Sequence, residues 1–447
     1  MSNTEYLSVG ELAADTPSNR QVLIAALVSC FGWALDLYDL VILLYVAPII
    51  GHLFFPADAP LLSMAAVFAS FGVTLVMRPV GSAWFGSYAD RRGRKGALML
   101  AVSLAGVVTL LLGALPTLRQ IGIFAPVLFV ALRLAQGIFI GGVTACTGTV
   151  GVEAISERWR GFMSGMVGGG GGAIGGMLAS AVFWITTSSM SGEAFGSWGW
   201  RIMFFTGIAS SLVGLLIAHK LEESPVWLKL RAAKVAKGAQ TAKERPIRRI
   251  FSKQYRGVFL ANMPLVIGAG AGYYLTSGYL PTYLKIVLHL RDHDISMILF
   301  LSSVGALFSS LLVGQLSQVF GRRPVFLCLG FIRLIILPAS VLLMVSAPGL
   351  LTVGAIAVTF GSLGNASYAP LLAFLNERFP TTLRASGVGL SWNVGFAIGG
   401  MAPTLTSLTA PSVSGLPATL AVFLAATSLL YLVGAFMVPE TRGNMLR

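Results

Sequence analysis

Charged residues are scarce in this chain. Only 11% of its 447 residues are Asp, Glu, Lys or Arg, whereas 55% are hydrophobic. An ordinary soluble domain carries about 25% charged residues, so this chain has too few to cover a globule. The composition therefore excludes an ordinary soluble protein and predicts one that crosses a membrane several times.

Cysteine and histidine are also scarce, and their positions exclude two kinds of site. The cysteines lie in apolar runs without paired spacing, which indicates small core residues rather than disulfides. The histidines lie near the ends of apolar runs, without metal-ligand spacing. These residues are Cys30, Cys146, Cys328, His52, His219, His289 and His293. With no nucleophile–base pairing either, the sequence predicts no metal, no cofactor and no enzyme.

Twelve apolar runs account for most of the chain. They are residues 22–50, 61–88, 96–115, 121–152, 161–187, 199–219, 257–289, 294–318, 325–346, 349–376, 385–409 and 416–438. Each can span a hydrocarbon core about 30 Å thick as a helix. Helix is expected because backbone polar groups in lipid must be satisfied within each segment, and the alternation of a barrel strand is absent. The predicted fold is an all-α membrane protein with twelve transmembrane helices.

The distribution of basic residues predicts the orientation. If the N-terminus is cytoplasmic, most of the 31 Lys and Arg residues fall in cytoplasmic segments. The net charge of +14 then reflects topology rather than nucleic-acid binding. The first 20 residues lack a basic n-region, so no cleavable signal peptide is expected. We therefore expect a multi-pass protein with both termini in the cytoplasm.

The chain divides into two halves. A long hydrophilic stretch predicts a first six-helix bundle over residues 1–220, a cytoplasmic linker over 221–255 and a second bundle over 256–447. "GSYADRRGRK" (residues 86–95) follows the second span, and "GQLSQVFGRR" (residues 314–323) follows the eighth in the same register. Such a parallel repeat is typical of alternating-access transporters, whose substrate site lies between the halves.

These motifs resemble a known family. "GSAWFGSYADRRGRK" (residues 81–95) resembles the signature loop of the major facilitator superfamily. Other stretches narrow the likeness to the metabolite:proton symporter family, whose members carry organic acids and zwitterionic solutes in bacteria. They are "LDLYDL" with "FFP", "LPTLRQIGIFAPVLFVALRLAQGIFIGG", "WGWRIMFF", "EESPVW", "YLPTYL" and "NERFPTTLRASGVGLSWNVGFAIGG". The resemblance covers nearly the whole chain and implies the two-bundle fold and the bacterial inner membrane.

The chain departs from the family pattern at three places. Asp36 stands where the family usually has Glu, Val143 and Thr144 replace a Glu and a Trp, and the fifth span is unusually rich in Gly. The Gly-rich stretch "GMVGGGGGAIGGM" (residues 165–177) indicates either a backbone-lined part of the cavity or close helix packing.

Two aspartates and one arginine are the candidates for proton coupling. Asp36 and Asp39 lie within one turn of the first span, where burial favours the protonated form of a carboxyl group. Arg133 lies mid-span and resembles the superfamily's fourth-span Arg, so it is a candidate both for proton coupling and for substrate contact. The alternative is that the aspartates simply pair with Arg133 or another fixed donor.

A second group of residues is expected to form a gate on the inner face. Asp90 ends the second span in the signature loop, whereas Gln318 stands in its place in the second copy, so only the first half carries the acidic latch. Arg78 is expected to belong to this inner network rather than to the substrate site. The gating candidates are Arg78, Gly86, Asp90, Arg91, Gly93, Arg94 and Glu153.

Polar and aromatic residues of the second half are the candidates for substrate binding, because ligand pockets are largely apolar with a few placed polar groups. Besides Arg133, they are Tyr273, Tyr274, Thr276, Tyr279, Asn365, Tyr368, Trp392 and Asn393.

The sequence therefore predicts a secondary transporter, working as a monomer, that moves a small organic solute together with a proton. A carboxylate is the favoured solute. A zwitterionic osmolyte is the alternative, placed second because the chain ends soon after Pro439 without a long charged extension. An exporter or antiporter of the same fold, and a transporter-like sensor, are further alternatives.

Overall fold

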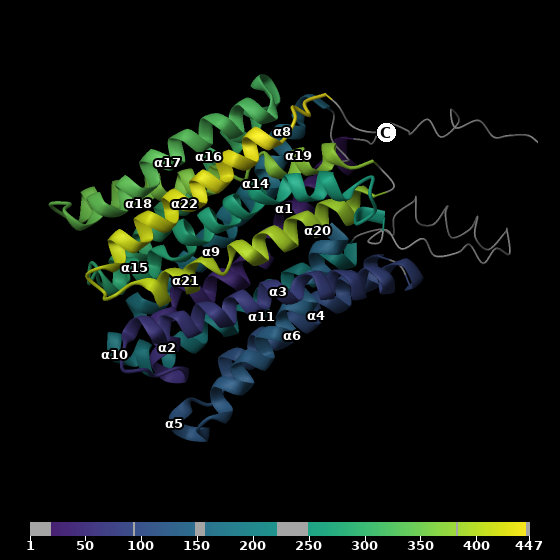
Figure 1. Cartoon of the computed structure of the whole chain (residues 1–447). Coiled ribbons are helices and arrows are strands. Elements are labelled where there is room, and N and C mark those ends of the chain that lie inside the picture. The colour runs from purple at the N-terminus through teal and green to yellow at the C-terminus, as the bar shows by residue number, and fades with distance from the viewer. Residues whose placement is uncertain (1–18, 93, 148–156, 221–248, 381–382, 444–447) are drawn as a thin grey trace, which may run out of the picture.

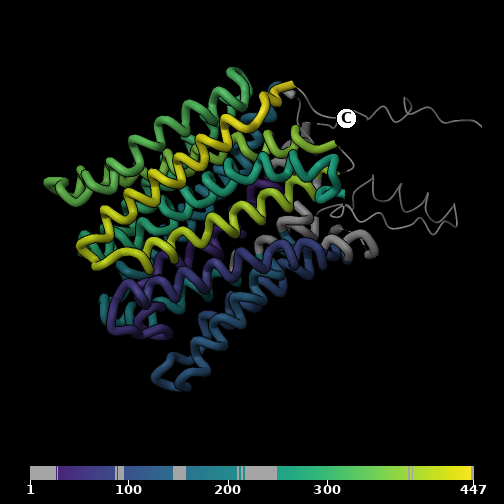
Figure 2. Tube along the Cα trace, in the orientation of Figure 1, coloured from purple at the N-terminus to yellow at the C-terminus, as the bar shows by residue number. Residues whose placement is uncertain are grey.

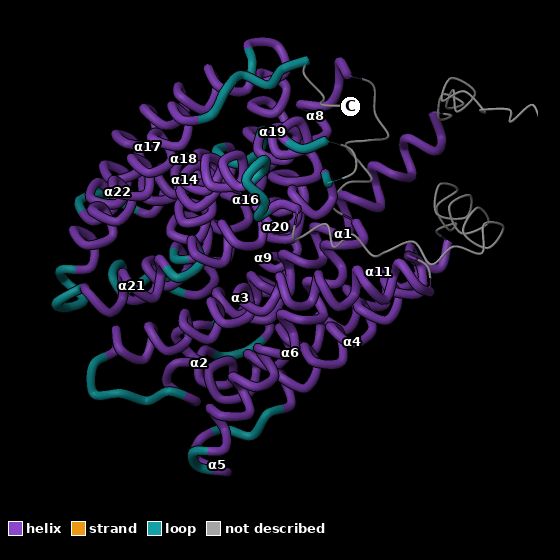
Figure 3. The backbone as a smooth tube through the Cα atoms, turned by 45° about the vertical axis from the view of Figure 1, so that its right-hand side comes forward, coloured by secondary structure: helices purple, strands orange, loops and turns teal. Residues whose placement is uncertain are grey.

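The described part of the chain consists almost entirely of helices and the short loops between them. The computed structural model describes residues 19–92, 94–147, 157–220, 249–380 and 383–443, and these ranges contain no strand. Figure 3 shows helices joined by short loops. Regular helix satisfies backbone hydrogen-bonding groups within each segment, as a membrane span requires.

The first half contains the helical elements that correspond to the first six predicted spans. They are α1 (Asn19–Tyr45), α2 (Ala47–Phe54), α3 (Pro60–Arg92), α4 (Arg94–Ala114), α5 (Leu118–Ile121), α6 (Phe124–Thr147), η1 (Glu157–Trp159), α8 (Arg160–Ser164), η2 (Gly165–Gly170), α9 (Gly171–Ser189), α10 (Gly192–Ala194), η3 (Phe195–Gly199) and α11 (Trp200–Lys220).

The second half repeats this pattern. Its elements are α14 (Arg256–Tyr273), η4 (Tyr274–Gly278), α15 (Leu280–Ile286), α16 (Asp292–Phe320), α17 (Arg322–Val345), α18 (Leu350–Ala366), α19 (Leu371–Arg378), α20 (Arg384–Gly399), α21 (Ala402–Thr409) and α22 (Leu416–Met437). Of the predicted linker, residues 221–248 lie outside the described part of the chain.

The twelve predicted spans are confirmed. Within the described residues, nine continuous helical runs are long and apolar enough to cross a membrane, and α1 with α2 forms a tenth span bent by 61°. The other two predicted spans, 199–219 and 385–409, correspond to α11 and to α20 followed by α21. The fold is the all-α, two-bundle architecture expected from the sequence.

The two halves lie side by side, and the axes of the spans are roughly aligned with one another (Figure 1). In Figure 2 the purple and blue tube of the first half lies below the green and yellow tube of the second. The short elements mark two ends: α8 and α19 lie at one end, and α2, α5, α10 and α15 lie at the other (Figure 1). We refer to these as the α8/α19 end and the α2/α15 end.

The glycines of the fifth span allow close packing on both of its sides. A Cβ added at Gly165 would lie 2.2 Å from the carbonyl oxygen of Ser310 on α16, and one at Gly175 would lie 2.4 Å from that of Ala34 on α1. Small residues let backbones approach in this way in membranes. The close-packing interpretation is confirmed, and Gly172 and Gly176 also line a cavity.

The halves contact each other at the α8/α19 end. The Ser164 hydroxyl donates to the Ala369 carbonyl at 2.6 Å and accepts from the Ala373 N–H at 2.9 Å. The Gly161 N–H donates to Oε1 of Gln318 at 3.1 Å. These three bonds join α8 to the α19 region and to α16, so the halves are in hydrogen-bonding contact at this end.

The halves also meet toward the α2/α15 end. Phe68 of the first half stacks on Tyr279 of the second, with ring centroids 4.9 Å apart. Closer to the middle, Gly72 faces the Met401 side chain so tightly that an added Cβ would lie 2.4 Å from the sulfur. Among the described residues, the two halves are therefore in contact on both sides of the space between them.

Candidate functional site

A cavity lies between the two halves. Its lining residues come from α1 and α3 of the first half and from α14, η4, α20 and the turn after α18 of the second. They are Trp33, Asp36, Leu37, Leu75, Arg78, Tyr273, Tyr274, Tyr368, Trp392, Asn393 and Phe396. We call this the central cavity. Its free volume is about 10 Å³, close to the least that holds one water molecule, so the lining side chains nearly fill it.

An ion pair forms one wall of the central cavity. Nη2 of Arg78 donates to Oδ1 of Asp36 at 2.7 Å, and Nη1 donates to Oδ2 at 3.1 Å. Only 6% of the Arg78 side chain and 2% of the Asp36 side chain is exposed. This bidentate geometry is the strong form of an arginine–carboxylate pair, and it makes the wall neutral overall.

The crossing of α3 and α6 holds Arg78 in place. A Cβ added at Gly137 would lie 2.1 Å from the Thr74 carbonyl oxygen, and one at Gly141 would lie 2.1 Å from that of Arg78. The Ser82 hydroxyl donates to the Gly141 carbonyl at 2.7 Å. Because glycines on α6 let α3 approach this closely, the backbone that carries Arg78 is fixed against a neighbouring helix.

Aromatic rings form much of the rest of the lining. Trp392 stacks on Phe396 with centroids 4.4 Å apart, and Trp33 meets Trp392 edge to face at 4.8 Å. Tyr368 lies edge to face against both second-half rings. Because Trp33 belongs to α1, this aromatic cluster joins the two halves across the cavity.

Several polar atoms of the cavity wall have no partner among the described residues. They are Nε1 of Trp33, Nε of Arg78 and Oδ1 of Asn393. All three residues are only 5% exposed. A buried polar group without a partner costs free energy, so a polar ligand that bonded to these atoms would be bound favourably.

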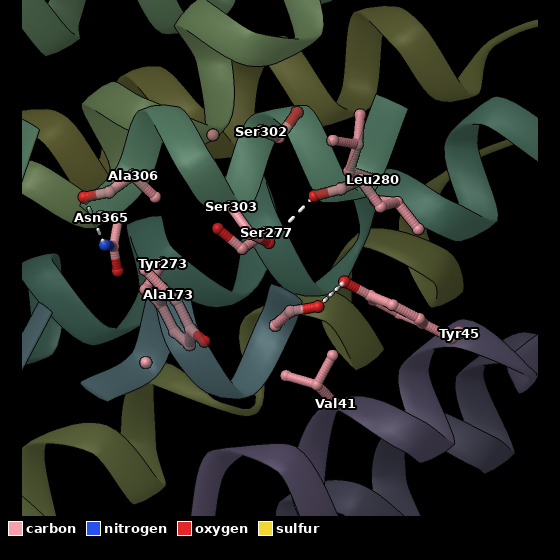
Figure 4. Close-up of a pocket in the computed structure, with 14 residues that line it drawn as sticks. Val41, Tyr45, Ala173, Tyr273, Ser277, Leu280, Ser302, Ser303, Ala306 and Asn365 are labelled. Carbon is pink, nitrogen blue, oxygen red and sulfur yellow. Dashed lines mark hydrogen bonds between the residues drawn. The ribbon is translucent and has the colours of Figure 1, made fainter. Parts of the chain in front are cut away.

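Tyr273 lines both the central cavity and a second cavity. Figure 4 shows the second cavity. It is bounded by the glycines of α9 on one side and by α16 on the other. Its polar lining is uncharged and consists of Tyr45, Tyr273, Ser277, Ser302, Ser303 and Asn365. The Asn365 amide donates to the Gly169 carbonyl at 3.0 Å and so ties α18 to the fifth span.

Asp39 is connected to Arg133 through two polar side chains. The Thr109 hydroxyl lies 3.4 Å from Oδ2 of Asp39, and the Gln136 amide donates to Thr109 at 2.9 Å. Nη1 of Arg133 in turn donates to Gln136 at 2.7 Å. All four residues are buried. We call Asp39, Thr109, Gln136 and Arg133 the buried polar chain.

Arg133 is a buried cation within the first half. Its guanidinium lies 5.5 Å from the centre of the Phe129 ring, and its Nε and Nη2 have no hydrogen-bond partner among the described residues. Arg133 is not among the residues that line the central cavity. The partner of Asp36 is therefore Arg78 rather than Arg133.

The structure divides the predicted substrate residues into two groups. Tyr273, Tyr274, Tyr368, Trp392 and Asn393 line the central cavity, and Asn365 lines the second cavity. Two others lie elsewhere within the described residues. The Thr276 hydroxyl bonds to the Gly272 carbonyl, and the Tyr279 hydroxyl pairs with Ser407.

Arg78, expected in an inner-face gate, lines the central cavity and pairs there with Asp36. It lies twelve residues before Asp90 in the 33-residue helix α3, so about three helical turns separate the two. The side chains of Gly86, Asp90, Arg91 and Arg94, together with Gly93 and Glu153, lie outside the described residues.

The second copy of the signature loop (residues 314–323) forms hydrogen bonds with both halves of the protein. Arg322 donates to Glu377 at 2.9 Å and to Gln318 at 2.6 Å, and Gln318 also accepts the bond from Gly161. Gly321 has a φ of 104°, which suits glycine. Gln318 therefore contacts the first half without a carboxylate.

Glu440 caps the start of α17 beside this loop. Its carboxylate accepts the N–H groups of Arg322, Arg323, Thr441 and Arg442. Partial burial acts to raise the pKa of Glu440, but the backbone hydrogen bonds outweigh it and hold the pKa below the ordinary value.

Several residues of the site were missed in the sequence analysis. Trp33 and Phe396 line the central cavity, and Thr109 and Gln136 complete the buried polar chain. Gln136 had a visible signal, since it is a polar residue three positions after Arg133 in an apolar span.

Comparison with known proteins places the chain in a family. The family described as "Sugar (and other) transporter" matches residues 25–254 and 247–447. The proline/betaine transporter of Escherichia coli (strain K12) is 31% identical over 390 residues, which cover 86% of this chain and 77% of that protein. The citrate-proton symporter of Klebsiella pneumoniae is 26% identical over 379 residues, covering 84% and 83%.

The fold is also that of a solved transporter. The structure matches a proton:xylose symporter of the major facilitator superfamily with a TM-score of 0.74 and 17% identity, over 96% of this chain and 98% of that one. The resemblance found in the sequence motifs is confirmed, and so is the expectation that the chain is a transporter and not an enzyme. The chain has the fold of a major facilitator superfamily transporter, belongs to the sugar (and other) transporter family, and is a multi-pass membrane transporter.

Proposed function

We propose that this protein is a proton-coupled symporter of a small zwitterion, a solute with one carboxylate and one cationic nitrogen. The observation that carries this proposal is the composition of the central cavity: a neutral Asp36–Arg78 pair faces a wall of aromatic rings. A solute with both charges matches such a wall without adding net charge to a buried site.

The aromatic wall suits the cationic end of the solute. The faces of Trp and Tyr attract ammonium groups, and the attraction grows when the site is desolvated. Trp33, Trp392 and Tyr368 lie within one cluster beside the ion pair. A quaternary or secondary ammonium would find both apolar contact and electrostatic attraction there.

The unpartnered donors suit the carboxylate end. Nε of Arg78 and Nε1 of Trp33 are buried N–H groups of the same cavity. Arginine is the residue best shaped to bind a carboxylate through two parallel bonds. A solute carboxylate would therefore bind at the Arg78 side of the cavity, with its nitrogen toward the rings.

The relatives support a zwitterion and keep an organic acid as the second candidate. The chain is similar both to proline/betaine transporters and to citrate-proton symporters. A tricarboxylate would bring three negative charges to a cavity whose described lining holds one arginine, already paired. The zwitterion, which the sequence placed second, is the solute that the cavity favours.

We infer that Asp39 carries the coupled proton. It lies one turn from Asp36 and is joined to Arg133 through Thr109 and Gln136. A buried carboxyl group can bind a proton when the surrounding charges move. A change in the position of Arg133 during alternation would alter the field at Asp39, and so would load or release its proton.

We also infer the orientation and the functional unit. The α8/α19 end, toward which the basic signature loops lie, faces the cytoplasm, following the bias of basic residues toward that side. Both termini are then cytoplasmic in the bacterial inner membrane. One chain supplies both walls of the central cavity, so a monomer is the transporting unit.

Transport by the purified protein in proteoliposomes tests the proposal. With an imposed inward proton gradient, we expect accumulation of glycine betaine or proline, together with acidification reported by a trapped pH-sensitive dye. Accumulation of citrate but of neither zwitterion would overturn the substrate assignment. Zwitterion exit coupled to proton entry would identify an antiporter instead.

A further inference from the structure

We propose that Asp36 makes the central cavity select zwitterions over anions. In the empty carrier Asp36 and Arg78 neutralise each other, and a bound zwitterion separates them, with its carboxylate on Arg78 and its cationic nitrogen beside Asp36. This inference rests on the proposed function and assigns the selectivity of its site to one residue.

The charges facing Asp36 support this role. Arg78 of α3 is the single cation among the described residues that line the cavity, and Asp36 is the single acid. The other titratable groups of that lining are the phenols of Tyr273, Tyr274 and Tyr368. Asp36 and Arg78 therefore have only each other, or a ligand, to balance their charges within this wall.

A simple anion would leave Asp36 without compensation. If a carboxylate replaced Asp36 on the two terminal nitrogens of Arg78, the displaced Asp36 would be a buried, unpaired charge. Breaking a buried pair by removing one partner is strongly unfavourable, and like charges brought together in a site reduce affinity further. Asp36 therefore actively lowers the affinity of the central cavity for anions.

A zwitterion avoids this cost. Its own cationic nitrogen takes the place of Arg78 beside Asp36, so each protein charge keeps an opposite partner. The aromatic cluster surrounds the same space, with Trp33 on the same helix as Asp36 and three residues before it. The carboxylate of the ligand also reaches the unpartnered Nε of Arg78 and Nε1 of Trp33.

Two isosteric probes isolate the contribution of the cationic nitrogen. Glycine betaine and 3,3-dimethylbutanoate have the same shape and the same carboxylate, but the second has carbon in place of the charged nitrogen. Binding of each to detergent-purified protein is measured by quenching of tryptophan fluorescence. For the wild-type protein we expect glycine betaine to bind at least about tenfold more tightly.

The variant Asp36→Asn keeps the shape of the side chain and removes its charge. We expect its preference for glycine betaine to fall to within about threefold, with 3,3-dimethylbutanoate bound more tightly than by the wild type. The matched control Asp58→Asn, at an exposed loop position, is expected to keep the wild-type preference. If Asp36→Asn does not fold, the variant Asp36→Ser, which also removes the charge and keeps Arg78, is expected to lose the preference as well.

The outcomes separate this inference from the proposed function. A wild-type protein that binds glycine betaine tightly, together with an Asp36→Asn or Asp36→Ser variant that keeps the full preference, would overturn the role of Asp36 alone. A wild-type protein that binds citrate but neither probe would overturn both.

Discussion

Asp36 on α1 and Arg78 on α3 hold each other through two hydrogen bonds, of 2.7 and 3.1 Å, in the wall of the central cavity. The first prediction follows from this pair. The variant Arg78→Gln leaves Asp36 as an uncompensated buried charge, which costs about 3–5 kcal/mol when one partner of such a pair is removed. We therefore expect a markedly lower melting temperature in detergent.

The double variant Asp36→Asn, Arg78→Gln provides the control, because it removes both charges at once. It is expected to recover most of the lost thermal stability, since replacing both partners is often nearly neutral. A double variant as unstable as Arg78→Gln would show that the two side chains do not depend on each other.

The second prediction concerns proton coupling. Asp39→Asn removes the titratable group at the end of the buried polar chain. We expect loss of solute accumulation driven by a pH gradient, while exchange of internal for external solute continues, because exchange requires no net proton movement. Solute accumulation driven by the pH gradient and solute exchange are both measured with the same proteoliposomes. Normal gradient-driven accumulation by Asp39→Asn would exclude this residue as the proton carrier.

The third prediction tests the packing of the fifth span. In Gly165→Ala the new methyl group meets the Ser310 carbonyl oxygen at 2.2 Å, so α16 must shift. Overpacking of this kind costs about 1–3 kcal/mol, and the melting temperature should fall. Gly96→Ala is the matched control, because a Cβ at Gly96 would meet nothing within 4 Å. Equal effects of the two substitutions would contradict close packing at Gly165.

The fourth prediction concerns closure at the α8/α19 end. Gln318→Ala removes the acceptor for the Gly161 N–H and one contact of Arg322. We expect the halves to separate more often at this end. Spin labels at the exposed positions Trp159 and Val319, in a background without native cysteines, should show a larger share of long distances. An unchanged distance distribution would mean that Gln318 does not contribute to closure.

The fold could be predicted from the sequence because it depends on local signals. Runs of apolar residues set the spans, and the loop repeat revealed two equivalent halves. The bends were harder to place. The break after Tyr45 lies just before Pro48, which has no backbone N–H and stands in the first turn of α2, but hydropathy alone does not show the 61° bend.

Only part of the site could be predicted from the sequence, and the Asp36–Arg78 pair shows why. The sequence shows that Asp36 is a carboxylate in an apolar span, but not which helix faces it. Arg78 and Arg133 were both available, and the choice depends on the crossing of α3 and α6 at Gly137 and Gly141. The aromatic residues of the second half were recognised by type, although Thr276 and Tyr279 proved to bond elsewhere.

The most direct test of the central claim is a thermal-shift measurement on the purified wild-type protein with a panel of solutes. The panel contains glycine betaine, proline, 3,3-dimethylbutanoate, succinate and citrate. A ligand that binds only the folded state must raise the melting temperature with its concentration. The account predicts that the two zwitterions raise it and that the three acids do not at equal concentration. A rise with citrate or succinate, and none with either zwitterion, would contradict it.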